Sequence, residues 1–585
     1  MNVVVEVRLE REQKRHRSGR AKIRGVDREV RLFKDFSSGG GTKALAGLDL
    51  PAETVELLGS ESALLSAEED PAFAFIQDET ERRVLHQTPV RSTGAGDDTG
   101  RPERGHGRAP PRLRRAAAKI ESTNATVGRE TVTRTLIAGG VVVTGGGMTT
   151  ADVLVEDGSI ARIGPDLDRS ADRVVDAEGH LVLPGAIDVH VHPVYLDDLR
   201  DCSIAAAHGG MTTLIHYAYA KPGHGLLETV RRFREEGEGG SILDFALHGG
   251  IFDAANQADE VPAAIAEGVT SFKMFMTYAK LGWMTDDYQL MRVLDILGRA
   301  GGMGMVHAEN GLATDYLQDK FASEGRDPVD AFVDTRPAVL EAEAVGRAIA
   351  MAQVASCPIY IPHVSAGLAL DAIVAARTRG ARVLAETCPQ YLTLTDADLR
   401  RQGPLLKIGP PLRTDADRAA LWTGVADGSI DTVASDHAPK AKAPGDDFDA
   451  APYGSPQLET MLPLLLHATL GDERLTLPRL TQVLSETPAR IFGLYPRKGT
   501  IAAGSDADLV VVDPAAAWTI ERRASHSNAT YSPYEGRTVT GRPILTMRRG
   551  EILAERGELT GSPGRGRFLR TETAGSETRT RKGNE

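Results

Sequence analysis

Leu-Pro-Gly-Ala-Ile-Asp-Val-His-Val-His, which spans Leu183 to His192, is the most informative stretch of this chain. Its β-branched apolar residues predict a strand, and two histidines end it just before Pro193. Because alternate side chains of a strand point to the same face, His190 and His192 project together. Two imidazoles that converge at a strand end form half of a metal site, although such a pair also occurs as ordinary surface or core-edge histidines. Residues further along the chain distinguish the two interpretations.

Length and composition predict a globular protein with more than one folded unit. The chain has 585 residues, of which 41% are apolar and 25% charged, and this is too long for one ordinary core. The formal net charge of −13 argues against nucleic acid or an anionic membrane as the main partner. Three cysteines without a Cys-x-x-Cys pair are typical of the reducing cytoplasm. The sequence contains neither an apolar run long enough for a membrane span nor a secretory signal.

Residues 1–130 differ from the rest and are expected to form an N-terminal extension that is disordered or poorly structured. Gly100 to Arg115 are rich in Arg, Gly and Pro and show no periodicity. Such a stretch cannot bury enough apolar surface to offset its ordering entropy. Leu45 to Glu69 are compatible with one or two short helices. A basic segment of this kind can also bind an acidic partner, and this alternative stays open.

Two β-rich blocks flank a long central region. Thr135 to Thr144 and Ala151 to Gly164 predict strands separated by glycine-rich turns, and a similar block returns from Gly499 to Leu553. We therefore expect one small β-sandwich domain built from segments on both sides of the centre. The expected domains are the small β-domain at 131–183 plus 496–560, the central domain at 184–495 and a C-terminal tail at 561–585.

Within the central region, strand patterns alternate with helical patterns. Further strands are predicted at 212–217, 244–248, 271–276, 304–308, 358–363, 382–387 and 432–435, with helices such as 337–355 and 368–379 between them. About eight strand–helix units indicate the α/β class and a (β/α)8 TIM-type barrel, whose chemistry lies at the C-terminal strand ends. The alternative is an open doubly wound sheet, but its Gly-x-Gly-x-x-Gly fingerprint is missing after the first strand.

Polar residues also end or interrupt the later predicted strands. They are Lys273, His307, His363 and Asp436. Each has an ordinary explanation on its own: a satisfied core histidine, a lysine paired with a carboxylate, or a helix N-cap for Asp436. Together with the first histidine pair they offer nitrogen and oxygen donors and no thiolate. Such a set suits zinc, and also manganese or iron, in one or two metal sites.

With these residues in place, the chain resembles the cyclic amidohydrolases of the hydantoinase/dihydropyrimidinase family, within the wider dihydroorotase and allantoinase group. The likeness covers about Thr135 to Glu572. It is carried by further motifs, namely Glu-Thr-Cys-Pro-Gln-Tyr-Leu (Glu386 to Leu392), Pro-Pro-Leu-Arg (Pro410 to Arg413), Phe-Gly-Leu-Tyr-Pro-Arg-Lys-Gly-Thr-Ile (Phe492 to Ile501), Gly-Ser-Asp-Ala-Asp-Leu-Val (Gly504 to Val510) and Tyr-Glu-Gly (Tyr534 to Gly536).

The resemblance implies two divalent metal ions, usually zinc. His190 and His192 bind the first ion in such an enzyme, and His307 and His363 bind the second. Lys273, carbamylated on its amine by CO2, bridges both ions, and Asp436 completes the first site. The carbamate turns a cation that repels metal ions into an anionic oxygen donor.

The same resemblance implies hydrolysis of the ring amide bond of a cyclic ureide, of the hydantoin or dihydropyrimidine type. A metal-bridging hydroxide attacks the ring carbonyl, and Tyr278 stabilises the oxyanion. Asp436 acts as general base and then as general acid. Tyr278 has an alternative role as a packing aromatic. The family also implies a homo-oligomer, a tetramer or a dimer.

The residues expected to bind the substrate depart from the family pattern. Backbone groups of two loops contact the ureide ring in hydantoinase-like enzymes, and the substrate-binding residues expected here are Tyr278, Gly409, Tyr453 and Gly454. Gly409 stands where the family usually has serine, and Tyr453 stands in place of the asparagine of an Asn-Gly pair.

The residues after His192 bear on the choice of substrate. Dihydroorotases carry an arginine at this point to hold a carboxylate, whereas Pro193-Val194-Tyr195 stand here, which favours a neutral cyclic ureide. An allantoinase, or another cyclic imide or ureide hydrolase, is the nearest alternative. A non-catalytic tetrameric interaction protein of the same fold is the alternative of another class, and the filled set of ligand positions argues against it.

Overall fold

The computed structural model describes residues 5–10, 16–23, 29–35 and 134–572. The chain forms two compact units, Met1–Val127 and Gly128–Glu585. The first contains an antiparallel sheet of β1 (Val5–Glu10), β2 (His16–Ile23) and β3 (Glu29–Asp35), in that order. The short helices considered for Leu45 to Glu69 and the basic stretch from Gly100 to Arg115 lie outside the described residues.

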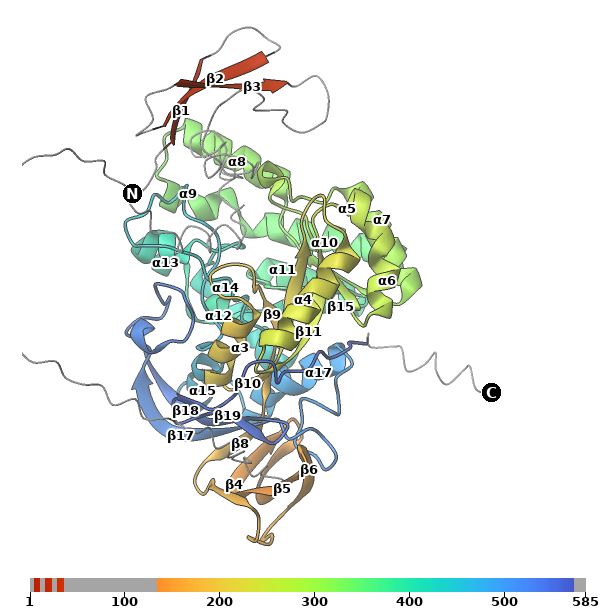
Figure 1. The fold of residues 1–585 in the computed structure, drawn as a ribbon, viewed down its shortest axis with the longest axis vertical. Coiled ribbons are helices and arrows are strands. Elements are labelled where there is room, and N and C mark those ends of the chain that lie inside the picture. Colours follow the sequence, from red (N-terminus) through yellow and green to blue (C-terminus); the bar gives the residue numbers. More distant parts are fainter. Residues whose placement is uncertain (1–4, 11–15, 24–28, 36–133, 573–585) are drawn as a thin grey trace, which may run out of the picture. The chain divides into compact units, whose positions relative to one another are not determined.

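The second unit is built around an eight-stranded parallel barrel (Figure 1), in which the strands follow one another around the ring in chain order. They are β9 (Ala186–Val191), β10 (Met211–Ala220), β11 (Asp244–Ile251), β12 (Ser271–Phe275), β13 (Met303–His307), β14 (Ile359–Ile361), β15 (Val383–Thr387) and β16 (Thr432–Val433). The ring closes where the His192 N–H donates to the His437 carbonyl at 3.0 Å and the His437 N–H donates to the His190 carbonyl at 3.3 Å. The expected (β/α)8 TIM-type barrel is confirmed.

Helices cover the outside of the barrel, as α4, α7, α10 and α11 do in Figure 1. The helices of at least five residues are α3 (Leu199–His208), α4 (Leu226–Gly240), α6 (Val261–Ala266), α7 (Asp287–Ala300), α8 (Gly311–Ser323), α9 (Pro328–Thr335), α10 (Ala338–Val354), α11 (Gly367–Thr378), α12 (Pro389–Thr393), α13 (Asp396–Gln402), α14 (Asp415–Asp427), α15 (Met461–Leu470), α16 (Leu477–Thr481) and α17 (Thr487–Ile491), with a π-helical turn at Gln482–Glu486. Their starts follow local sequence, because Asp286 caps α7 and Thr414 forms a capping box with Asp417 at α14. Within the described ranges, no helix combines the length and the apolarity needed to cross a membrane.

Alternation along the strands separates two apolar cores. In β10, Ile215, Tyr217 and Tyr219 belong to the cluster inside the barrel. Leu214 and Ala218 belong to the larger cluster shared with the surrounding helices. This alternation is the period-two geometry of a strand that is buried on both faces, and it leaves the ends of the strands as the place for polar chemistry.

The small domain is a mixed sheet at the lower end of the view in Figure 1. Its strands are β4 (Arg134–Thr144), β5 (Gly147–Glu156), β6 (Ser159–Gly164), β7 (Arg173–Asp176), β8 (Leu181–Pro184), β17 (Leu509–Thr519), β18 (Thr538–Arg548), β19 (Glu551–Glu555) and β20 (Glu558–Leu559). The order is β20-β19-β18-β17-β8-β4-β5-β6, with β7 beside β4. Because β8 pairs with β17, strands from both sides of the barrel share one sheet, as expected.

A buried charge network joins the small domain to the barrel. The Lys498 ammonium lies 2.6 Å from Asp244, the first residue of β11, 2.8 Å from Asp508 and 2.9 Å from Asp506. Burial opposes the charge of Lys498, but the surrounding carboxylates outweigh burial and raise its pKa. Asp244 also accepts from Arg549 and from the Arg567 N–H, so the described part of the C-terminal segment is tied to the same network.

We predict that Lys498→Met lowers the free energy of unfolding by about 3–5 kcal/mol, because it leaves buried carboxylates without their cation. Thermal and urea denaturation of the full chain measure the effect. The control is Lys320→Met, since Lys320 makes only an exposed i,i+4 pair with Glu324, and this change is expected to cost less than about 1 kcal/mol. Equal stability of the two variants contradicts the assigned role of Lys498.

Candidate active site

The residues predicted as metal ligands lie on the barrel strands or just after them. His190 is in β9 and His192 follows it, Lys273 is in β12, His307 ends β13, His363 follows β14 and Asp436 follows β16. In a parallel barrel these ends meet at one face, which is the face that carries the chemistry of such folds.

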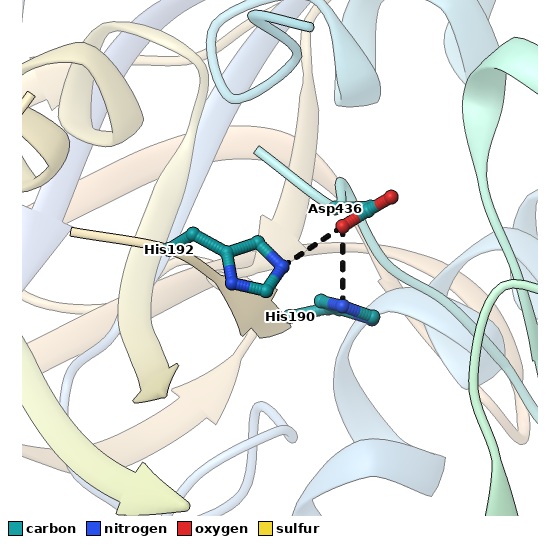
Figure 2. Close-up of side chains that lie close together, drawn as sticks. All are labelled: His190, His192 and Asp436. Carbon is teal, nitrogen blue, oxygen red and sulfur yellow. Dashed lines mark hydrogen bonds and ion pairs between the residues drawn. The ribbon is translucent and has the colours of Figure 1, made fainter. Parts of the chain in front are cut away.

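Three of these side chains form one compact group (Figure 2). The Oδ1 atom of Asp436 lies 3.0 Å from Nε2 of His192 and 3.2 Å from Nε2 of His190. The three donor atoms lie within 4.8 Å of one another. Although burial alone would raise the pKa of Asp436, the two imidazoles hold it well below its usual value. The group thus presents two nitrogens and an ionised oxygen to one point.

Glu386 determines how His190 can act. Its Oε1 atom lies 2.6 Å from Nδ1 of His190, so a ring proton belongs on Nδ1 and Nε2 is the nitrogen left to face the centre. The Nε2 atom of His190 faces the Asp436 carboxylate at 3.2 Å. Although burial alone would lower the pKa of His190, the carboxylates of Glu386 and Asp436 raise it to about 9, so a positive charge at this point, a proton or a metal ion, is favourable. The donor set therefore fits a divalent metal ion, with Glu386 as the carboxylate that orients a ligating histidine.

The remaining predicted ligands form a second group beside the first. Nζ of Lys273 lies 3.2 Å from Nε2 of His363, and the rings of His307 and His363 are 4.5 Å apart. The His363 ring is in turn 5.3 Å from that of His190, so all the predicted ligands come together. Burial lowers the pKa of His307 and of His363, which favours the neutral imidazole that binds metals.

Lys273 is buried between the two groups. Burial lowers its pKa to about 8, against the raising effect of Asp436. A minor fraction of its amine is therefore neutral near physiological pH, far more than for an exposed lysine. Because CO2 adds only to a neutral amine, Lys273 is suited to carbamylation, and as a carbamate it would offer oxygen to a metal ion in either group.

Strained backbone supports several of these positions. Tyr278, His363 and Asp436 have φ angles of 64°, 44° and 51°, in the left-handed region that side chains other than glycine rarely adopt. Such conformations cost about 1–3 kcal/mol each and persist where the surroundings impose them. Three of the predicted site residues thus share a feature that is typical of functional sites.

The residues predicted to contact the substrate lie beside this centre. The Tyr278 ring is 5.2 Å from that of His307 and 5.6 Å from that of Tyr453. A β-carbon at Gly409 would lie only 2.6 Å from the Tyr278 hydroxyl oxygen and 3.2 Å from the Tyr453 ring. The absence of a side chain at 409 therefore makes room for both tyrosines. Glycine in place of the usual serine is compatible with the bulkier residue at 453.

The backbone groups of Gly454 form hydrogen bonds with other residues of the protein. Its N–H donates to the carbonyl of Lys407 at 3.2 Å. Its carbonyl accepts from the Lys442 ammonium at 2.7 Å and from the Tyr531 hydroxyl at 3.1 Å. These bonds fix the loop that carries Tyr453, so in this conformation Gly454 supports the pocket wall.

Several residues without a predicted role complete the site. Glu309 accepts from His307 at 2.8 Å, and the guanidinium of Arg336 lies 3.7 Å from Glu309 and donates to the Tyr453 hydroxyl at 2.7 Å. Glu386 and Glu309 lie at or just after predicted strands, so the strand-end signal that identified the ligands could have found them. Arg336 lies just before α10 and follows no strand, so this signal does not reach it.

His437 holds the loop of Asp436. Its Nε2 atom lies 2.9 Å from Asp197, and its Nδ1 atom accepts from the backbone N–H groups of Gln457 and Leu458. Its main chain makes the hydrogen bonds that close the barrel at β9. These contacts determine where the neighbouring carboxylate of Asp436 lies.

Known proteins share this sequence and this fold. The model of the amidohydrolase family matches residues 181–553. D-hydantoinases from Ralstonia pickettii and Rhizobium radiobacter are each 38% identical, over 451 and 449 residues, which is 74% of this chain and 98% of each relative. Among solved structures, a D-hydantoinase has a TM-score of 0.72 at 38% identity, with 75% of this chain and 99% of the other covered.

A dihydropyrimidinase from Brevibacillus agri NCHU1002 has the same TM-score of 0.72 at 34% identity, again with 75% of this chain and 99% of the other covered. Sequence, fold and the converging polar residues agree. The chain belongs to the amidohydrolase family, in its hydantoinase/dihydropyrimidinase group, and is a hydrolase of carbon–nitrogen bonds in cyclic amides.

Proposed function

We propose that this enzyme opens the ring amide bond of a cyclic ureide of the hydantoin or dihydropyrimidine type. The observation that carries the proposal is the convergence of His190, His192 and Asp436 with the second group around Lys273 and His363, within hydrogen-bond and ring-contact distances. Two relatives that align with this chain over 98% of their own length are named D-hydantoinase and D-phenylhydantoinase.

We further propose that two divalent metal ions, most simply Zn²⁺, occupy the two groups. His190, His192 and Asp436 would hold one ion, and His307 and His363 the other, with carbamylated Lys273 shared between them. When bound, such ions supply Lewis-acid polarisation of a carbonyl and a hydroxide-like nucleophile near neutral pH. The convergence of the donor atoms of His190, His192 and Asp436 supports the first site, and the neutral imidazoles support the second.

The chain's own residues then handle protons and charge. Asp436 would accept the proton of the attacking water and deliver it to the ring nitrogen, because an amide anion is a poor leaving group. Its low pKa keeps it ionised, so its oxygens are available as acceptors. Tyr278 would donate a hydrogen bond from its hydroxyl to the developing oxyanion. Burial keeps the pKa of Tyr278 well above its usual value, so the hydroxyl stays protonated as a donor.

The proposal includes a cytoplasmic homo-oligomer, a tetramer or a dimer, as the resemblance implies. The three cysteines of the protein, Cys202, Cys357 and Cys388, are buried as free thiols, which is compatible with a reducing compartment. A non-catalytic interaction protein would not need the full set of predicted metal ligands, and this argues against that alternative.

A substrate panel tests the reaction class. We expect the metal-loaded enzyme to hydrolyse hydantoin, 5-substituted hydantoins or dihydrouracil. Formation of the ring-opened product measures the reaction. Allantoin and dihydroorotate belong in the same panel because an allantoinase or another ureide hydrolase is the alternative. Inactivity on every compound, in a preparation that holds metal, would contradict the proposed function.

Metal analysis tests the role of Lys273. After incubation with Zn²⁺ and bicarbonate, the wild-type chain is expected to retain about two ions, whereas Lys273→Met, which has no amine to carbamylate, retains fewer. Mass spectrometry of the dialysed proteins counts the metal. Lys320→Met is the matched control and is expected to behave as wild type. A wild-type chain that takes up no metal rules out the proposed centre.

Removal of one hydroxyl tests Tyr278. We expect Tyr278→Phe to lower kcat by about a hundredfold to a thousandfold with a smaller change in KM, since the lost hydrogen bond acts on the transition state. Steady-state kinetics on the best substrate of the panel measure this. The matched control is Tyr288→Phe, because Tyr288 is 75% exposed on α7. An unchanged kcat in Tyr278→Phe assigns Tyr278 to packing alone.

A further inference from the structure

The hydroxyl of Tyr278 has to lie at a defined point, although its residue lies in a loop. Tyr278 comes three residues after Phe275, the last residue of β12, and its side chain is half-buried. Its ring is 5.2 Å from that of His307, a predicted metal ligand. A hydrogen-bond donor to a reacting atom has to be held to within about 0.5 Å. The neighbours of Tyr278 therefore have to supply the precision that its loop lacks.

The bare main chain at Gly409 bounds the hydroxyl of Tyr278 on one side. A β-carbon at 409 would lie 2.6 Å from that hydroxyl oxygen, which is closer than a carbon and an oxygen that share no bond can approach. The φ angle of Gly409 lies outside the left-handed region. The obstacle to a side chain at 409 is therefore space and not the backbone conformation.

The Tyr453 ring bounds Tyr278 on another side. The two rings meet edge to face, with centroids 5.6 Å apart and an angle of 64° between their planes. A β-carbon at Gly409 would also lie 3.2 Å from this second ring. Tyr278, Gly409 and Tyr453 thus form one packed group, in which each member limits the space of the other two.

Buried cations hold Tyr453 in turn. Arg336 donates from Nη2 to the Tyr453 hydroxyl at 2.7 Å, and its guanidinium carbon lies 5.2 Å from the centroid of the ring. Nζ of Lys407 lies 4.9 Å from the same centroid. With its amide oriented to accept, Gln318 lies 3.0 Å from Nη1 and 3.1 Å from Nη2 of Arg336, which fixes the guanidinium itself. Tyr453 cannot turn without losing its hydrogen bond and its cation–π contacts.

We propose that Gly409 and Tyr453 are positioning residues that set where the Tyr278 hydroxyl lies, and that Arg336 acts to the same end through Tyr453. This inference rests on the proposed function, in which that hydroxyl donates to the oxyanion. Gly409 and Tyr453 are the two expected substrate-binding positions at which the chain departs from the family pattern. Their departures then serve one purpose, because the smaller residue makes room for the hydroxyl and the larger residue supports its ring.

A double-mutant cycle with Tyr278→Phe tests Gly409, because this change removes the atom that a side chain at 409 would meet first. We expect Gly409→Ala to lower kcat of the metal-loaded enzyme by about tenfold to a hundredfold, with a change in KM below about threefold. In the Tyr278→Phe background, the same change should lower kcat by less than about threefold. Gly346→Ala on α10 is the matched control, since a β-carbon there would meet open space among the described residues.

The same cycle tests Tyr453. We expect Tyr453→Leu to lower kcat by about tenfold and Tyr453→Phe, which loses only the hydroxyl that Arg336 contacts, by about threefold. Both effects should disappear in the Tyr278→Phe background. The exposed Tyr288→Leu is the control. Melting temperatures give a readout without turnover: Gly409→Ala should lower the melting temperature of the wild-type chain more than that of Tyr278→Phe. The metal content should stay at the wild-type level in every variant.

The outcomes separate this inference from the proposed function. An equal fold-loss of kcat in both backgrounds, or a loss confined to KM, overturns the positioning role and leaves the proposed function intact. A wild-type kcat in Gly409→Ala does the same, and so does an equal drop in melting temperature in both backgrounds. Inactivity of the metal-loaded wild type on all cyclic ureides overturns both proposals. If Gly409→Ala fails to fold, the two Tyr453 variants still decide the question.

Discussion

The pairing of β9 with the segment after β16 is the contact on which the site depends. The His192 N–H donates to the carbonyl of His437, which lies 245 positions further along the chain, and the His437 N–H donates to the carbonyl of His190. This contact closes the ring of parallel strands and brings Asp436 to the histidine pair. Since all strands run in one direction, closing the ring also gathers Lys273, His307 and His363 at the same face. Without closure, the same residues would be spread along an open sheet edge.

Periodicity and strand ends made much of this predictable. Alternating strand and helix patterns indicated the barrel, and polar residues at the ends of apolar runs indicated the ligands, because both signals are local. The residues that contact those ligands were harder to predict from the sequence. Glu386 contacts His190 across 196 positions, and Arg336 meets Tyr453 through a loop whose course no local pattern determines. The three strands within residues 5–35 were not anticipated either, since that region showed no clear motif.

The strained residues show why the barrel has to be rigid. Left-handed backbone at Tyr278, His363 and Asp436 is unfavourable for each residue alone. At Asp436 the compensation is visible, because the flanking His437 is held by Asp197 and by two backbone N–H groups. The orientation of a catalytic side chain such as Asp436 thus depends on the contacts that its sequence neighbour makes. Changes in those neighbours are expected to alter the site without touching the reacting atoms.

The departures from the family pattern lie on loops, whereas the residues of the metal centre lie on strands or directly after them. Gly409 lies 22 residues after the end of β15 and Tyr453 lies 20 residues after the end of β16, where a substitution does not disturb the ladder. The two loops are moreover linked, because Lys442 donates to the carbonyls of both Lys407 and Gly454, and the Gly454 N–H donates to the Lys407 carbonyl. A change in substrate preference therefore requires the loops to change together. Lys407 and Lys442 are buried because their ammonium groups donate to loop carbonyls that would otherwise lie without partners in the interior.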